Sequence, residues 1–176
     1  MPPMTERSEF VEFALGVYGA DGVSAACLTL QDRCSVDVNL VFFAAYLGAR
    51  RGRTITTSDV DRAAGRVRRW NREVVAPLRD LRNRLSDGPP PAPTEDTEAL
   101  RKQVKDAELQ AEMLELAELA SLDGDMGIVD GGGGAAERAA AAIEVVLRVT
   151  GTPGPERRGT DAVGVIASAA ARYGAA

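Results

Sequence analysis

One segment of the chain, from Val38 to Ala49, is apolar around nearly its whole helical circumference. Asp37 stands immediately before it, and Asp is one of the residue types that commonly cap the N-terminus of a helix. A helix without a polar face has to be covered by other elements on all sides. We therefore predict that 38–49 is a helix at the centre of the core and that Asp37 caps it.

Apolar residues recur at helical spacing through almost the whole chain, and no segment shows the strict alternation of a β-strand. We predict an all-α fold with a compact N-terminal helical core, long amphipathic helices and a weaker C-terminal helical hairpin. The expected units are a helical core at 8–85, a proline-rich spacer at 86–94, an acidic helix with a helical hairpin at 95–150, and a loop with a weak terminal helix at 151–176.

The longest helix of the expected core runs from Asp59 to Leu85, with Thr57 or Ser58 as its N-cap. Its apolar stripe follows the alternating three- and four-residue spacing of coiled coils. The stripe consists of Val60, Ala64, Val67, Trp70, Val74, Leu78, Leu81 and Leu85. Pro77 lies within this helix, where it lacks a backbone N–H and clashes with the preceding turn, so we expect a kink or a break.

Beyond the spacer a second amphipathic helix is expected, over roughly Glu98–Leu122. Its predicted apolar stripe again has three- and four-residue steps, and consists of Leu100, Val104, Ala107, Ala111 and Leu114. Because the spacer is short, the two long helices are expected to be antiparallel neighbours.

Charge divides the long helices into two opposite blocks. Residues 50–84 contain 11 Arg against four acids, a local net charge of +7, whereas residues 95–125 contain ten acids against three bases, a net charge of −7. An Arg-rich helix can bind nucleic acid or another partner, and the candidate residues for that role are Arg68, Arg69, Arg72 and Arg79. The alternative is that the blocks face each other, and we prefer it because Trp70 falls in the apolar stripe and is expected in the core.

Four polar residues, Gln31, Asp32, Asp37 and Asn39, form the densest polar cluster in apolar surroundings. They could line a small-molecule or divalent-cation pocket, in which paired carboxylates would hold the ion. The simpler interpretation is that Asp37 caps the following helix while Gln31 and Asp32 close the preceding turn, and we favour it because capping alone accounts for Asp37.

The same region carries a resemblance to a known family. Leu30-Gln31-Asp32 and Asp37-Val38-Asn39-Leu40 are its most specific motifs, and Tyr46-Leu47-Gly48 and Pro77-Leu78-Arg79 extend it. With these motifs, most of residues 9–120 resembles an uncharacterised, chiefly proteobacterial family of small helical proteins, a domain of unknown function. The resemblance implies no activity. Its pattern has Gly near Ser35, and Ser disfavours the left-handed turn that Gly would permit freely.

Composition bears on function mainly through what is missing. The chain has no His, which excludes His-based catalytic triads and His metal ligands, and its two cysteines, Cys27 and Cys34, are too few for a zinc site. No cofactor motif is found, and the chain shows neither a signal peptide nor a membrane-spanning run, so we expect a cytoplasmic protein without a cofactor or metal.

Three hypotheses for the function remain. The first is a non-enzymatic helical interaction or adaptor protein that binds a protein partner or a second copy through its long amphipathic helices. The second is a small-ligand or metal-dependent enzyme that uses the Gln31, Asp32, Asp37 and Asn39 cluster, and the third is a nucleic-acid binder that uses residues 50–84. We favour the first because no catalytic constellation is present.

Overall fold

The computed structural model describes the backbone of residues 4–129, 132–152 and 156–173, and the side chains within 9–129, 132–152 and 161–173. The elements are α1 (Met4–Tyr18), α2 (Val23–Cys34), α3 (Val38–Ala49), β1 (Arg53–Thr54), α4 (Thr57–Trp70), α5 (Ala76–Asp87), α6 (Glu95–Ala120), β2 (Ile128–Val129), α7 (Ala135–Thr150) and α8 (Glu156–Tyr173). A π-helical turn, Asn71–Val75, joins α4 to α5. The predicted all-α fold is confirmed, apart from the two-residue antiparallel pairing of β1 with β2.

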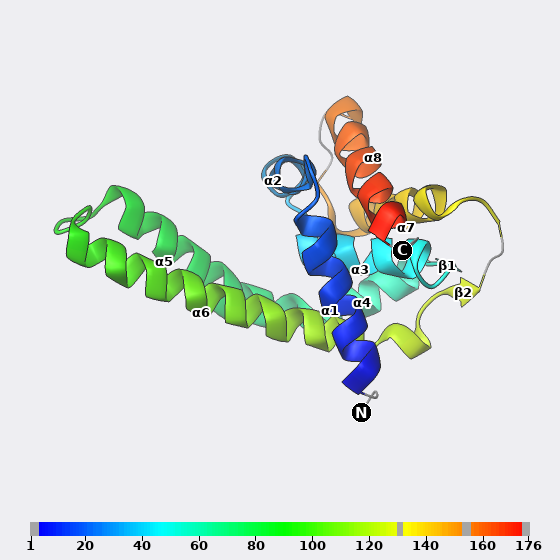
Figure 1. The fold of residues 1–176 in the computed structure, drawn as a ribbon, viewed down its shortest axis with the longest axis horizontal. Helices are drawn as coiled ribbons and strands as arrows, with labels where there is room; N and C mark the ends of the chain where they lie inside the picture. The colour runs from blue at the N-terminus through cyan, green and yellow to red at the C-terminus, as the bar shows by residue number, and fades with distance from the viewer. Residues whose placement is uncertain (1–3, 130–131, 153–155, 174–176) are drawn as a thin grey trace.

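The central position of α3 follows from its composition. Every residue from Val38 to Gly48 except Asn39 is buried, and α1, α4, α6, α7 and α8 all pack against the helix (Figure 1). Aromatic rings from α1 cover one side, with Phe10 5.3 Å from Phe43 and 5.2 Å from Tyr46 between ring centroids. Such edge-on and tilted contacts are the favourable geometry for aromatic pairs. The prediction of a central helix capped by Asp37 is confirmed.

The C-terminal helices belong to this same core. Buried side chains from Phe10 to Ala170 form a single cluster, to which α7 contributes Ile143 and α8 contributes Ile166. Helix α7 crosses α3 so closely that a Cβ atom on Gly48 would lie 2.6 Å from the carbonyl oxygen of Arg138. The expected C-terminal helical hairpin therefore packs directly on the residues predicted as the 8–85 core.

The element that does stand apart is a long antiparallel hairpin of α5 and α6, which projects from the globular core (Figure 1). The proline-rich segment 86–94, expected as a spacer between two units, forms the tip of this hairpin between Asp87 and Glu95. We refer to α5, the π-helical turn and the part of α6 that faces them as the arm. The end of α6 near Leu119 is buried in the core and fixes the arm to it.

The helix that leads into the arm begins at Thr57, two residues earlier than predicted. Its N-cap is Thr56, whose side chain accepts from the backbone N–H of Asp59 while the Asp59 side chain accepts from the backbone N–H of Thr56. This reciprocal capping box satisfies two backbone donors at once, which explains why Thr56 is the cap and not Thr57 or Ser58.

Pro77 is accommodated by a π-helical turn immediately before it, and the helix runs on through Asp87. Within that turn the backbone N–H of Ala76 donates to Asn71 O, five residues back. Because a π-helical turn takes up about one extra residue, it rotates the following helix face by about 100° relative to an unbroken α-helix. The predicted apolar stripe is therefore buried as far as Val67 but turns outward beyond it, where Leu81 is exposed.

The buried face of α6 also differs from the predicted one. Val104 and Ala111 are buried as expected, but Leu100, Ala107 and Leu114 are exposed. The buried positions include two acids instead, Glu108 and Glu115. This face is buried because α4 and α5 present polar and basic side chains to it.

No single helix among the described residues is long and apolar enough to cross a bilayer. Taken together, α1 and α2 are long and apolar enough for a span that is bent by 94° between them, by length and composition alone.

Ser35 follows α2 with a φ of 53°, in the left-handed region, although the sequence made such a turn less expected. The turn forms because it ends the helix with two backbone hydrogen bonds, from Ser35 N–H to Gln31 O at 3.1 Å and from Val36 N–H to Leu30 O at 3.5 Å. Serine in this conformation carries a steric cost that glycine does not.

We predict that Ser35→Gly stabilises the protein by about 1 kcal/mol, because Gly relieves the left-handed strain. Urea denaturation of both proteins measures the difference. Ala25→Gly, at an exposed interior position of α2, is the matched control and should instead destabilise by about 1 kcal/mol. Equal decreases in the free energy of unfolding of both variants would contradict the proposed strain at Ser35.

Candidate functional site

A polar cluster built around one fully buried acid lies where the arm joins the core. Its four members come from separate parts of the chain: Asp37 and Asn39 from the start of α3, Asn71 from the π-helical turn, and Glu115 from α6. We call these four residues the root cluster. Glu115 is 0% exposed, which is rare for a carboxylic acid.

Hydrogen bonds join every member of the root cluster. The Asp37 carboxylate accepts from Asn39 N–H at 2.9 Å, as the cap of α3. Glu115 Oε1 accepts from Asn39 Nδ2 at 3.1 Å, and Glu115 Oε2 accepts from Asn71 Nδ2 at 3.2 Å. Asn39 thus bridges the two acids, with its backbone N–H on Asp37 and its side-chain amide on Glu115, and each acid influences the pKa of the other.

Burial governs the protonation of both acids. It raises the pKa of Glu115 to about 8, and the nearby charge of Asp37 and the hydrogen bond to it act in the same direction. Burial also raises the pKa of Asp37, against the opposing effects of Glu115 and of the hydrogen bond from the Asn39 backbone. Burial and the proximity of the two acids therefore favour a protonated pair at neutral pH.

A charged layer continues outward along the arm from the root cluster. Arg79 of α5 donates to Glu108 at 3.0 Å and to Glu112 at 2.7 Å, and Arg82 lies 3.1 Å from Glu108. Burial opposes the charge on Arg79, but its two carboxylate partners outweigh burial and raise its pKa. Nearer the core, Arg66 pairs with Glu118 at 2.7 Å. The basic and acidic blocks of the sequence thus face each other.

The structure separates the four residues predicted as a polar cluster into two pairs. Asp37 and Asn39 meet in the root cluster, whereas Gln31 is half-buried and Asp32 exposed near the end of α2. Within the described part of the chain, no hydrogen bond or ion pair joins the side chains of Gln31 or Asp32 to the other two. Asp37 caps α3 as favoured above, and in addition it contacts Glu115.

Sequence reasoning missed Asn71 and Glu115. Glu115 is seven residues from Glu108, so both acids lie on one face of α6, and that periodicity was the available signal. Asn71 carried no comparable signal, because its orientation depends on the π-helical turn.

The candidate arginines also divide. Arg79 points toward α6 and its acids, while Arg68, Arg69 and Arg72 are exposed on the outer side. Arg69 and Arg72 both pair with Glu73, at 3.0 and 2.8 Å. Trp70, expected in the core, is instead 37% exposed, and its indole Nε1–H donates to Ala111 O at 3.0 Å.

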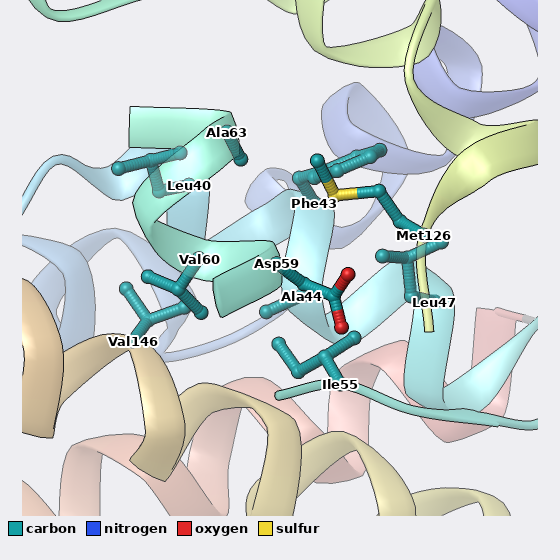
Figure 2. Close-up of a pocket in the computed structure, with 10 residues that line it drawn as sticks. All are labelled: Leu40, Phe43, Ala44, Leu47, Ile55, Asp59, Val60, Ala63, Met126 and Val146. Carbon is teal, nitrogen blue, oxygen red and sulfur yellow. The ribbon is translucent and has the colours of Figure 1, made fainter. Parts of the chain in front are cut away.

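A small apolar cavity lies in the core between α3 and α4, and Ile55 and Met126 help to line it (Figure 2). Its volume of about 10 Å³ is about what a single water needs, so it is not a site for a larger ligand. The one charged side chain beside it, Asp59, is held by the Thr56 capping box. Among the described residues, no group of three or more His, Cys, Asp and Glu could hold a metal ion.

We predict that Arg79→Met destabilises the protein by about 2 kcal/mol, because it leaves the buried Glu108 with only Arg82 as a cation partner. Arg66→Met is the matched control: it removes a pair that is exposed on both sides, and should cost about 0–1 kcal/mol. Urea denaturation measures both. Equal decreases in the free energy of unfolding of the two variants would contradict a role of the charged layer in stability.

The fold and the root cluster can now be set beside known proteins. No curated protein and no solved structure matches the chain. A family model described as a protein of unknown function, DUF2390, matches residues 9–119, a range that begins in α1 and ends in α6. This range includes the root cluster and the arm. The match covers more than half of the chain, which therefore belongs to the DUF2390 family of proteins of unknown function.

Proposed function

We propose that this protein is a non-enzymatic interaction module that binds a helical protein partner, or a second copy of itself, through one face of the arm. The observation that carries the proposal is a row of large apolar side chains left exposed on the projecting hairpin and at the end of α4, which leads into it. The row consists of Trp70 at 37%, Leu81 at 45%, Leu100 at 48% and Leu114 at 57% exposure.

Helical geometry places these side chains on one side of the arm. Leu100 and Leu114 are fourteen residues apart, which is close to four full turns, so they share a face of α6. The indole of Trp70 reaches Ala111 O, one turn from Leu114, and therefore lies on that same side. On α5, Leu78 and Leu85 flank Leu81 at three- and four-residue spacing and are half-buried.

This surface suits an apolar helix. Rows at three- and four-residue spacing accept a partner helix by knobs-into-holes packing, with the aromatic side chain as an anchor. Arg79 pairs with Glu108 and Glu112 at the α5–α6 contact, so these charges face each other and not a partner. Contiguous exposed apolar side chains are a feature of interaction sites.

The nucleic-acid alternative is favoured by one observation, the exposure of Arg68, Arg69 and Arg72 on the outer side of the helix. Glu73 neutralises part of this charge, and Arg79 is turned toward α6. Such binding should weaken steeply between low and moderate salt, and failure to bind DNA or RNA at low salt would remove the alternative.

The enzyme alternative has less support, because its four proposed residues do not converge. Asp37 and Asn39 hold Glu115 in a buried cluster, and Gln31 and Asp32 lie apart from them. Screening for a thermal shift with Mg²⁺, Mn²⁺ and metabolites tests this alternative, and no shift would set it aside.

We predict that the double variant Leu81→Glu and Leu114→Glu weakens association at least tenfold, about 1.4 kcal/mol, because it places charges in the apolar face. Analytical ultracentrifugation measures self-association, and a pull-down from lysate measures partner binding.

Leu28→Glu is the matched control, since Leu28 is equally exposed but lies on α2, away from the arm. It should leave association unchanged. A wild-type protein that is strictly monomeric and retrieves no partner would contradict the proposed function, as would a control variant with the same loss.

A further inference from the structure

The meeting of Asp37 and Glu115 in the root cluster has a chemical consequence that is independent of the arm's partner. Glu115 is 0% exposed and shares Asn39 with Asp37, and two carboxyl groups held this close are most stable when one of them carries a proton, since two carboxylates repel each other. The two acids lie on α3 and α6, which are far apart in sequence. A single proton therefore contributes to holding α6 against the start of α3.

The surroundings of the pair contain few charges that could replace this proton. Asn39 and Asn71 donate to Glu115, but both are neutral amides. The arginines on the neighbouring helices are paired elsewhere: from α5, Arg79 and Arg82 bind Glu108 and Glu112, and from α4, Arg66 binds Glu118. From α1, Glu9 is paired with Arg50 and Arg51. Of these, Arg79 is the cation that acts on Asp37.

We propose that Asp37 and Glu115 form a proton-dependent latch, which clamps the root of the arm to α3 while they share a proton and loosens when that proton is lost. With both acids ionised, the negative charge of the fully buried Glu115, to which only neutral amides donate, would face that of the half-buried Asp37. Separating α6 from α3 lets water solvate both carboxylates, so the root is the part of the fold that opens.

The direction of the pH effect follows from the folded and unfolded acids. The pKa of Glu115 is raised to about 8 in the folded protein, from an ordinary value near 4.5. Between these values the latched state binds a proton that the open or unfolded state does not. The latch is therefore tightest at or below the ordinary value, weakens as pH rises through this window, and is loosest from about pH 8 upward.

A reporter of this change is built into the molecule. Trp70 is the only Trp in the chain, and its indole is hydrogen-bonded to Ala111 O, one helical turn before Glu115. Because α4 and α6 meet through this bond, loosening of the root moves the indole into water. Trp fluorescence thus reads the latch without an added probe.

The experiment is a pH titration of Trp fluorescence from about pH 6 to about pH 10 on the full chain, at one protein concentration. We expect a red shift with a midpoint near pH 8 while the far-ultraviolet circular dichroism stays constant. Glu115→Gln keeps a side-chain oxygen for the two amides and an N–H donor for Asp37, so it should abolish the transition. Glu118→Gln is the control on the same helix, and should titrate like the wild type.

A second variant keeps the test decisive if Glu115→Gln fails to fold. Asp37→Asn retains a good N-cap and removes the negative charge beside Glu115, so the midpoint should move to lower pH. A flat wild-type titration would overturn the latch, as would an unshifted midpoint in Asp37→Asn or a transition that persists in Glu115→Gln. None of these outcomes depends on whether the arm binds a partner.

Discussion

The burial of α3 is the constraint on which the rest of the structure depends. Its apolar side chains point in every direction, so no single layer of helices can cover it. Helices from both ends of the chain complete the shell, and α7 has to approach to backbone contact at Gly48. The C-terminal half, which has few aromatic residues, is therefore ordered mainly by the surface that α3 presents to it.

The one end of α3 that is not apolar determines where the arm is attached. Asp37 caps the N-terminus of the helix, and together with the Asn39 side chain it brings polar groups to the edge of the core. A buried polar group has to find partners, and Glu115 and Asn71 supply them. The face of α6 that carries acids is consequently turned inward, although a face with more leucine was available.

Sequence reasoning succeeded where one local rule governs the outcome. The all-round apolar character of α3 and the capping residue before it predicted both its bounds and its central place. Reasoning failed at α5 and α6, where apolar spacing predicted Leu100 and Leu114 as buried and they are exposed. The faces of those helices are decided by polar contacts such as Arg79 with Glu108, which span 29 residues and leave no local pattern. Asp37 was identified from the sequence, but its partner Glu115 was not.

One local irregularity connects the site with the proposed interaction surface. In an uninterrupted helix from Thr57 to Asp87, the leucines of α5 would continue the buried stripe of α4 and face α6. The π-helical turn before Pro77 rotates this face by about 100°, which leaves Leu81 exposed and brings Arg79 onto the acids of α6. The same turn carries Asn71, whose amide binds Glu115. The exposed apolar row and the buried polar root are thus two results of a single extra residue in one helical turn, which explains why both lie on the arm.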